Sequence, residues 1–300
     1  MRVFMISAAA ALALVGPTVP IAARQGAASG SPQTVAQSLL AADRSFAKAA
    51  AKRSAQDAIS AMIVDDVVMF IVPQPPLARG KVEAMSVLGK AFAGKPSTLS
   101  WTPVGFGISS DGQQGFTYGF TTRSIEGEAA QDGKYLAYWV KRPEGWRVAA
   151  YKLVPRPAGD VSTELRPILP ERIVPAAKQG AEKYRAEVDS VERAFSDESQ
   201  VTGLGAAFRK YGTAEAMNVG GSADFTYGND AIAAGFGDEK TSPLRWAPDG
   251  VLVASSGDLG ITYGYLQRNG EVPKGRLAKI PWFTVWRRAA PGQPWRYIAE

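Results

Sequence analysis

The sequence of 300 residues contains no cysteine and no histidine. The missing cysteine excludes disulfide bonds, a lipoprotein anchor and thiolate nucleophiles. The missing histidine excludes Ser-His and Cys-His catalysis, and both absences together exclude zinc or copper sites built on imidazole and sulfur. Neither an Asp-rich calcium loop nor a glycine-rich phosphate loop is present. We therefore expect a protein without a metal site and without a cofactor.

Long apolar runs are also missing, apart from one at the N-terminus. Residues Val3–Val15 are apolar, and a Gly-Pro breaker and small residues up to Ala23 follow them. Thirteen apolar residues are too few for a membrane span, which needs about 20, but they are typical of a secretory signal. We expect residues 1–23 to be a cleaved signal peptide and residues 24–31 a flexible lead-in. The mature chain is then periplasmic or secreted, without stable membrane insertion.

The charged residues are dispersed. The formal net charge is +6, but the 34 basic residues are scattered among 28 acidic ones. This balance is typical of an ordinary solvated surface, and no nucleic-acid-binding motif accompanies it. We expect no nucleic-acid partner.

What the sequence does contain is an internal repeat. The segment Trp101–Phe120 reappears 145 residues later as Trp246–Tyr265, and the two segments align without a gap. Nine of the twenty positions are shared: Trp101/Trp246, Pro103/Pro248, Gly105/Gly250, Ser110/Ser255, Gly112/Gly257, Gly115/Gly260, Thr117/Thr262, Tyr118/Tyr263 and Gly119/Gly264. A repeat at a fixed period indicates tandem copies of one fold.

Proline density separates the two copies. Five prolines fall between residues 155 and 175, which excludes a continuous helix or a central strand there. We expect this segment to be a semi-rigid connector. Domain 1 then covers residues 32–154 and domain 2 residues 176–300.

Each copy has the pattern of helices followed by strands. Ser31-Pro32 is a helix-start signature, and apolar residues follow it at helical spacing, as they do 149 residues later. Ser54 begins a capping box, and Val67–Val72 reads as a buried strand ended by prolines. We further predict a helix over 80–92 and strands over 99–108, 116–125, 135–141 and 146–154, then helices over 202–211 and 228–236 and strands over 244–254, 261–267, 278–288 and 295–299. This order predicts an α+β fold, with helices on one face of a curled antiparallel sheet.

Several short segments carry a family resemblance. They are Asp43-Arg44-Ser45-Phe46 in the first helix, Asp66, Arg79-Gly80, and the strand segments Tyr138–Arg142 and Glu144–Val148. Together with the element order, they resemble the NTF2-like superfamily and its DUF4440/SnoaL-like branch. The resemblance implies two tandem NTF2-like cone-shaped barrels whose open sheet faces pack together as an intramolecular pseudo-dimer. Members include isomerases, cyclases, dehydratases and non-catalytic ligand-binding modules, so no single activity follows.

Two acidic residues of domain 1 are candidates for catalysis. Asp65 and Asp66 stand at the predicted start of the first strand, where a desolvated carboxylate can act as a base. Their counterparts 148 residues on are Thr213 and Ala214, so the pair does not recur. Asp66 as the base of an active domain 1 is one interpretation. Two exposed turn carboxylates are the other.

Two tyrosines are candidates for contact with a ligand or substrate. Tyr118 and Tyr263 occupy the same position of a Thr-Tyr-Gly segment, and strand alternation puts Phe116 on the same face as Tyr118. If that face lines a cavity, the hydroxyls can bond a ligand oxygen. Otherwise they are core tyrosines.

Three further residues complete the predicted site. Arg79 precedes a helix and can hold an anionic group beside the helix N-terminus. Tyr227 is its counterpart in domain 2, and Trp139 is one of seven tryptophans, all on predicted strands. The alternative for Arg79 is a surface arginine whose aliphatic stem covers apolar neighbours. The alternative for the aromatic residues is that they fill the core or the face between the copies.

The leading hypothesis is an exported NTF2-like protein that binds a small apolar or amphipathic molecule without catalysis. One alternative is a cofactor-free isomerase or lyase in domain 1, with Asp66 as base and Tyr118 or Arg79 stabilising an enolate. Another is a structural or protein-interaction module of the cell envelope. The sequence leaves open the ligand, the oligomeric state and which of the two pockets is open.

Overall fold

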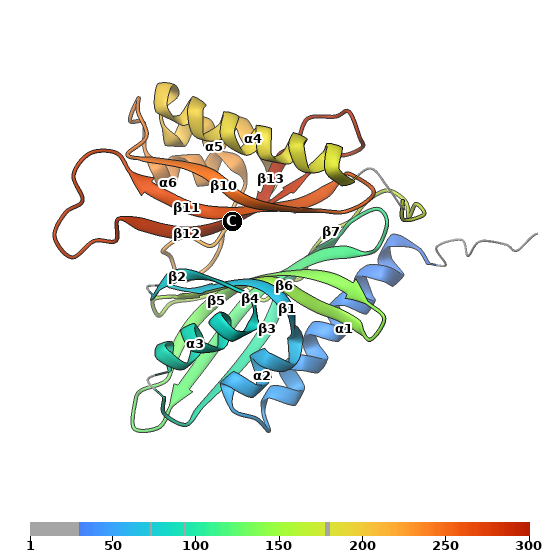
Figure 1. Cartoon of the computed structure of the whole chain (residues 1–300), viewed down its shortest axis with the longest axis vertical. Coiled ribbons are helices and arrows are strands. Elements are labelled where there is room, and N and C mark those ends of the chain that lie inside the picture. The colour runs from blue at the N-terminus through green and yellow to red at the C-terminus, as the bar shows by residue number, and fades with distance from the viewer. Residues whose placement is uncertain (1–29, 73, 93, 178–180) are drawn as a thin grey trace, which may run out of the picture.

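Two sheets lie face to face in the middle of the molecule, and helices cover their outer sides (Figure 1). The computed structural model describes residues 30–72, 74–92, 94–177 and 181–300. The predicted signal peptide and most of the lead-in lie outside these residues. The fold is α+β, with one helix-covered sheet in each half of the chain, as the sequence predicts. In the described part of the chain, no helix combines the length and the apolar composition needed to cross a membrane.

Domain 1 is one mixed sheet with helices on its outer side. Its elements are α1 (Pro32–Ala50), α2 (Ala55–Met62), β1 (Ile63–Ile71), β2 (Gln74–Arg79), α3 (Lys81–Ala91), β3 (Ser97–Ile108), β4 (Gln114–Ile125), β5 (Gln131–Arg142), β6 (Gly145–Pro155) and β7 (Arg166–Ile168). The strand order is β2-β1-β6-β5-β4-β3-β7. Strands β3 to β6 form the predicted antiparallel meander, and β1 joins β6 in parallel.

Domain 2 repeats this topology. Its elements are α4 (Ala181–Thr202), α5 (Leu204–Tyr211), β8 (Gly212–Asn218), β9 (Thr226–Tyr227), α6 (Asn229–Phe236), β10 (Leu244–Val253), β11 (Leu259–Arg268), β12 (Lys279–Arg287) and β13 (Arg296–Ala299). The strand order is β10-β11-β12-β13-β8-β9, with β13 and β8 parallel. Each strand of domain 2 thus has a counterpart in domain 1, and β7 of domain 1 is the strand without a counterpart in the described part of domain 2.

Both predicted helix starts in domain 1 are confirmed. The Ser31 hydroxyl accepts a hydrogen bond from the Thr34 backbone N–H at 3.2 Å, and Pro32 occupies the first turn of α1. The Ser54 hydroxyl accepts from the Asp57 N–H at 3.1 Å at the start of α2. Caps of this kind stabilise a helix by about 1 kcal/mol.

Proline-containing segments form edge strands that the sequence analysis did not predict. The prolines after Val72 were expected to make a turn, but Gln74–Arg79 form β2, which is antiparallel to β1. The connector contributes β7, which is parallel to β3 at the other edge of the sheet. Edge strands tolerate proline because their outward N–H groups need no partner in the sheet.

The repeated glycine and tyrosine residues build the same irregularity in both sheets. The β3–β4 register shifts between Pro103 and Gly105, and the β10–β11 register shifts at the equivalent place. A Cβ atom on Gly105 would lie 1.9 Å from the ring of Tyr118, and one on Gly250 would lie 2.2 Å from the hydroxyl of Tyr263. Only glycine therefore lets the tyrosine ring lie across the neighbouring strand.

Apolar side chains of the two facing sheets form one continuous core between the domains. The rings of Phe70 and Phe283 lie 6.0 Å apart across it, and those of Tyr118 and Phe225 lie 5.0 Å apart. Its buried members are Val68, Phe70, Leu77, Val104, Phe116, Tyr118, Leu136, Tyr138 and Ala150 of domain 1 and Met217, Val219, Phe225, Leu259, Ile261, Phe283, Val285, Ile298 and Ala299 of domain 2. The predicted intramolecular pseudo-dimer is confirmed.

Two aspartates exchange hydrogen bonds across one end of this core. Asp258 accepts from the Ser110 backbone N–H at 2.9 Å and from the Ser110 hydroxyl at 2.6 Å. Asp111 accepts from the Ser255 hydroxyl at 2.7 Å and from the Ser256 N–H at 3.1 Å. Each domain thus caps a turn of the other, which explains why Ser110 and Ser255 are shared by the two copies.

A buried lysine fastens the domains at a second place. The Lys134 ammonium reaches from β5 into the loop between β8 and β9, where it donates to the carbonyl oxygens of Val219, of Ser222 at 2.7 Å and of Asp224 at 3.0 Å. The side chain is fully buried. These oxygens converge on one cation, so the loop conformation depends on the lysine charge.

Removal of this ammonium group tests its contribution. We expect Lys134→Met to lower the free energy of unfolding by about 2–4 kcal/mol, because buried carbonyl oxygens lose their donor. Urea denaturation measures the change. Lys52→Met, at an exposed position, is the control and should stay within about 0.5 kcal/mol. Equal stabilities of Lys134→Met and the parent would contradict this role.

Candidate functional site

A carboxyl group is buried inside each domain, at the same position of its first helix. In domain 1 it belongs to Asp43, which accepts hydrogen bonds from the Trp101 indole N–H at 2.6 Å and from the Tyr135 hydroxyl at 2.7 Å. Nearby, the Trp139 indole N–H donates to the Thr117 hydroxyl at 2.8 Å. This polar cluster ties α1 to strands β3, β4 and β5.

Domain 2 builds the same cluster around Glu192. Its carboxylate accepts from the indole N–H of Trp246 at 2.5 Å and of Trp286 at 2.8 Å, and from the hydroxyl of Thr262 at 2.5 Å. Trp286 also donates to Thr262 at 3.0 Å. Neither acid was predicted as a site residue, although Asp43 and Glu192 lie 149 residues apart, at the offset of the repeated first helix, which was a signal for them.

The interiors of the two domains differ around these clusters. In domain 1, Tyr135 and Tyr151 are fully buried, and their rings lie 6.2 Å apart next to Asp43. The strand registers place Trp282 and Glu300 at the equivalent positions of domain 2. Two tyrosines that fill space are thus replaced by one indole and one carboxyl.

The replacement leaves a cavity of about 50 Å³ in domain 2. Its walls are mainly aromatic and aliphatic, and its lining residues are Glu192, Phe195, Leu204, Phe208, Phe236, Leu244, Trp246, Leu266, Trp282, Thr284 and Glu300. Phe236 is the most exposed of them, at 38%, and stands where the cavity meets the surface. The cavity therefore has a deep polar end and a single aromatic residue at its outer side.

Two buried donors, one on a residue that lines the cavity and one in the apolar cluster around it, lack partners among the described residues. Trp282 is 3% exposed, and its indole N–H has no hydrogen-bond acceptor among the described residues. The Tyr297 hydroxyl, in the same apolar cluster, has no partner there either. Buried donors without partners cost about 1–3 kcal/mol each, so a polar group of a bound molecule would remove that cost.

Burial raises the pKa values of the acids of domain 2. The pKa of Glu192 is raised to about 7 by desolvation, which its hydrogen bonds from Thr262 and the two tryptophans only partly oppose. Desolvation also raises the pKa of Glu300, against the opposing charge of Lys152. In domain 1, burial raises the pKa of Asp43 in the same way. The deep end of the cavity thus holds two acids, Glu192 and Glu300, whose pKa values burial raises.

The predicted ligand-contacting residues Phe116, Tyr118, Tyr227 and Tyr263 lie between the sheets instead. Phe116 and Tyr118 are fully buried in the inter-domain core, and Tyr227 and Tyr263 pack against its edge. Phe116 and Tyr118 lie on one face of β4, as strand alternation predicts. That face packs against domain 2.

The remaining predicted residues are spread over three places. The Arg79 guanidinium bonds to Asp249 of domain 2 at 2.8 Å and lies over the ring of Tyr263, so it belongs to the rim of the domain contact. Trp139 belongs to the buried cluster of domain 1. Asp66 is exposed and lies in a surface groove. Asp66, Tyr118 and Arg79 therefore do not share a pocket.

The structural equivalence at Asp66 also corrects the alignment of the repeats. Ile63 pairs with Val148 as Gly212 pairs with Tyr297, which sets the offset of this strand at 149 residues. The counterpart of Asp66 is therefore Glu215, not Ala214. An exposed acid recurs here in both domains, so its presence does not distinguish domain 1.

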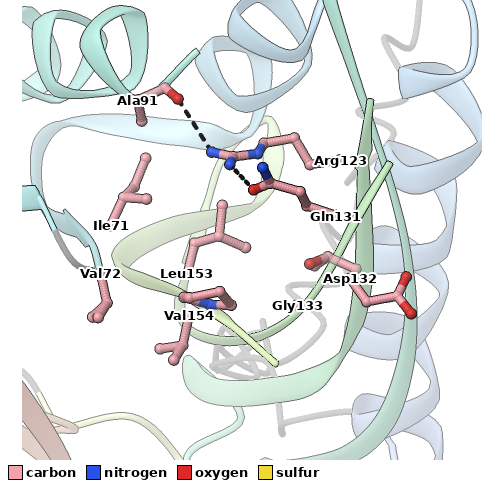
Figure 2. A pocket seen from close by; sticks show the side chains of 11 residues that line it. Ile71, Val72, Ala91, Arg123, Gln131, Asp132, Gly133, Leu153 and Val154 are labelled. Carbon is pink, nitrogen blue, oxygen red and sulfur yellow. Dashed lines mark hydrogen bonds between the residues drawn. The ribbon is translucent and has the colours of Figure 1, made fainter. Parts of the chain in front are cut away.

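A second pocket, of about 120 Å³, opens beside α3 in domain 1 (Figure 2). Ile71 and Leu153 form an apolar wall, and Arg123 lies opposite them at the rim. The guanidinium donates to the carbonyl oxygen of Ala91 at 3.1 Å and to the side-chain oxygen of Gln131. Burial lowers the pKa of Arg123, but an arginine remains charged at neutral pH.

Neither a protein-family model nor a curated protein sequence matches this chain. Among solved structures, a ketosteroid isomerase-like protein from Erwinia carotovora atroseptica is similar at 21% identity, over 39% of this chain and 92% of that one, with a TM-score of 0.32. An NTF-2 like protein of unknown function from Shewanella oneidensis is 11% identical, over 39% and 97%, with a TM-score of 0.33. One from Pseudomonas putida is 12% identical, over 42% and 89%, with a TM-score of 0.34. At these values the likenesses carry no argument about function.

The raised pKa of Glu192 predicts pH-dependent stability. Between the reference value of 4.5 and the folded value of about 7, the folded carboxyl holds a proton that the unfolded one has lost. The stability present below pH 4.5 is therefore lost as the pH rises through 7. We expect Glu192→Gln to reduce this loss by about 3 kcal/mol, measured by urea denaturation at each pH. Glu182→Gln, at an exposed position on α4, is the control, and parallel profiles for Glu192→Gln and the parent would contradict the assignment.

Proposed function

We propose that this protein binds a small, largely apolar molecule that carries a hydroxyl group, in the cavity of domain 2. The observation that carries the proposal is that Trp282 lines the cavity and that its buried indole N–H has no acceptor among the described residues. A bound oxygen atom would satisfy this donor. The aromatic and aliphatic walls favour an apolar body for the rest of the ligand.

The second polar group of the cavity narrows the chemistry of the ligand. Glu300 offers carboxyl oxygens in the same cavity that Trp282 lines. A ligand group that accepts from an indole and donates to a carboxylate is a hydroxyl, since it has one proton and two lone pairs. Glu192 is less available, because both of its oxygens already accept hydrogen bonds from the protein.

Phe236 sets how much of the ligand fits inside. A volume of about 50 Å³ is roughly a third of the ~150 Å³ cavity that holds a benzene molecule, so it takes only the hydroxyl end. The Phe236 ring stacks on Phe208 at 4.3 Å between centroids, and Gly235 and Gly237 flank it. A ligand ring can replace that stacking if Phe236 swings outward.

Binding without catalysis is the form of this function that the geometry supports. The residues considered for proton transfer in domain 1, Asp66, Tyr118 and Arg79, lie in separate places. The interior of that domain is filled by Tyr135 and Tyr151. We therefore assign the binding of this hydroxyl-bearing ligand to domain 2, within the NTF2-like architecture that the sequence resembles.

We also propose that the mature protein is exported. The support is the apolar run Val3–Val15, which ends in small residues at Ala23. Expression with the N-terminus intact in a Gram-negative host, followed by mass spectrometry of the periplasmic fraction, should yield a chain that begins at Arg24. A full-length chain retained in the cytoplasm would contradict export.

Phenol and toluene provide the test of ligand binding, since they have the same ring and nearly the same size and differ in a hydroxyl group in place of a methyl group. We expect phenol to bind about tenfold more tightly than toluene, the difference of one good hydrogen bond. Ligand-observed NMR titration measures both affinities. Trp282→Phe should abolish the difference, and Phe236→Ala should strengthen the binding of both compounds.

The control for Trp282→Phe is Tyr135→Phe. It removes a polar group at the equivalent position of domain 1, where the space is filled, and should leave phenol binding unchanged. Equal binding of phenol and toluene to the parent, or an unaltered preference in Trp282→Phe, would overturn the proposed contact.

A further inference from the structure

Arg123 brings a positive charge to the pocket of domain 1. No carboxylate lies within salt-bridge distance of it among the residues that the structure describes. Two acids act nearby: Glu128, whose charge reaches Arg123, pairs with Lys95 at 2.8 Å, and Asp132, which lines the pocket, pairs with Arg156 at 2.7 Å. Each of these acids has a basic partner of its own, so Arg123 can still form an ion pair with a bound anion.

The guanidinium is also held in a fixed orientation. Two of its five N–H donors are used, one by the carbonyl oxygen of Ala91 at the end of α3 and one by the side chain of Gln131. Its charge lies 5.3 Å from the centre of the Phe92 ring. The remaining donors are thus pre-organised, which lowers the entropic cost of binding a planar anion.

The rest of the pocket is apolar on the side opposite the charge. Ile71 and Leu153, labelled in Figure 2, form this side of the pocket, whereas Val72 and Val154 pack against the inter-domain core. A cavity of about 120 Å³ has the volume of roughly four water molecules at ~30 Å³ each. That space accommodates a carboxylate with a short alkyl chain, but not a long lipid tail.

We propose that this pocket is a second, independent binding site for a short-chain aliphatic carboxylate. The carboxylate lies on Arg123, whose forked donors match two oxygens in one plane. The alkyl chain lies on Ile71 and Leu153. This site shares no lining residue with the cavity of domain 2, so each can be lost without the other.

Butyrate tests the proposal, with 1-butanol as the neutral molecule of equal chain length. We expect butyrate to bind in the millimolar range and butanol at least tenfold more weakly, and we expect salt to weaken butyrate binding. Arg123→Gln should weaken butyrate at least tenfold, and Arg123→Lys should weaken it less. NMR titration of the full mature chain measures these affinities.

Two controls separate this site from its surroundings. Arg142→Gln removes an exposed arginine of the same domain that lies outside the pocket, and Trp282→Phe alters only the cavity of domain 2. Both should leave butyrate binding unchanged. Unaltered affinity in Arg123→Gln, or equal binding of butyrate and butanol, would overturn the proposal. Equal binding of inorganic phosphate would overturn the role of the alkyl chain.

Discussion

The structure depends on the burial of two apolar sheet faces against each other. Each sheet is apolar on both sides, because its helices cover one face and the other domain covers the second. A single domain would expose residues such as Phe70, Phe116 and Tyr138 to water, a patch that isolated soluble proteins rarely carry. The hydrogen bonds of Asp111, Asp258 and Lys134 act at the borders of this core and fix how the sheets are aligned. The fold is therefore stable as a pair, and the connector keeps that pair within one chain.

The two domains share this architecture but differ in the side chains next to their buried acids. Both retain a buried acid bonded to a tryptophan, Asp43 in one and Glu192 in the other. In domain 1, Tyr135 and Tyr151 fill the space next to the cluster, and the hydrogen bonds of Asp43 hold the first helix on the sheet. In domain 2, Trp282 and Glu300 take the places of these tyrosines and line a cavity. The structural difference between the domains thus lies beside the buried acid and leaves its hydrogen bonds in place.

The fold could be predicted from the sequence because helical spacing, strand alternation and the repeat all indicated the same architecture. The site could not. Alternation places Tyr118 on one face of its strand, but it does not tell whether helices or another sheet cover that face. The counterpart of Asp66 was misassigned by one residue, because the offset between the copies changes between the first strand and the later ones. The cavity depends on the volumes of Tyr135, Tyr151 and their replacements, which become neighbours only after the strands pair.

The Lys134 contact is present on only one side of the pair of domains. Pro281 occupies the equivalent position in domain 2, so the loop contact exists on one side of the pseudo-symmetric pair only. Two identical subunits would have carried either two such contacts or none. A one-sided contact requires that the two halves differ in sequence, so that a change in one half need not suit the other. The lysine therefore marks the two domains as complementary parts, each specialised for its own place.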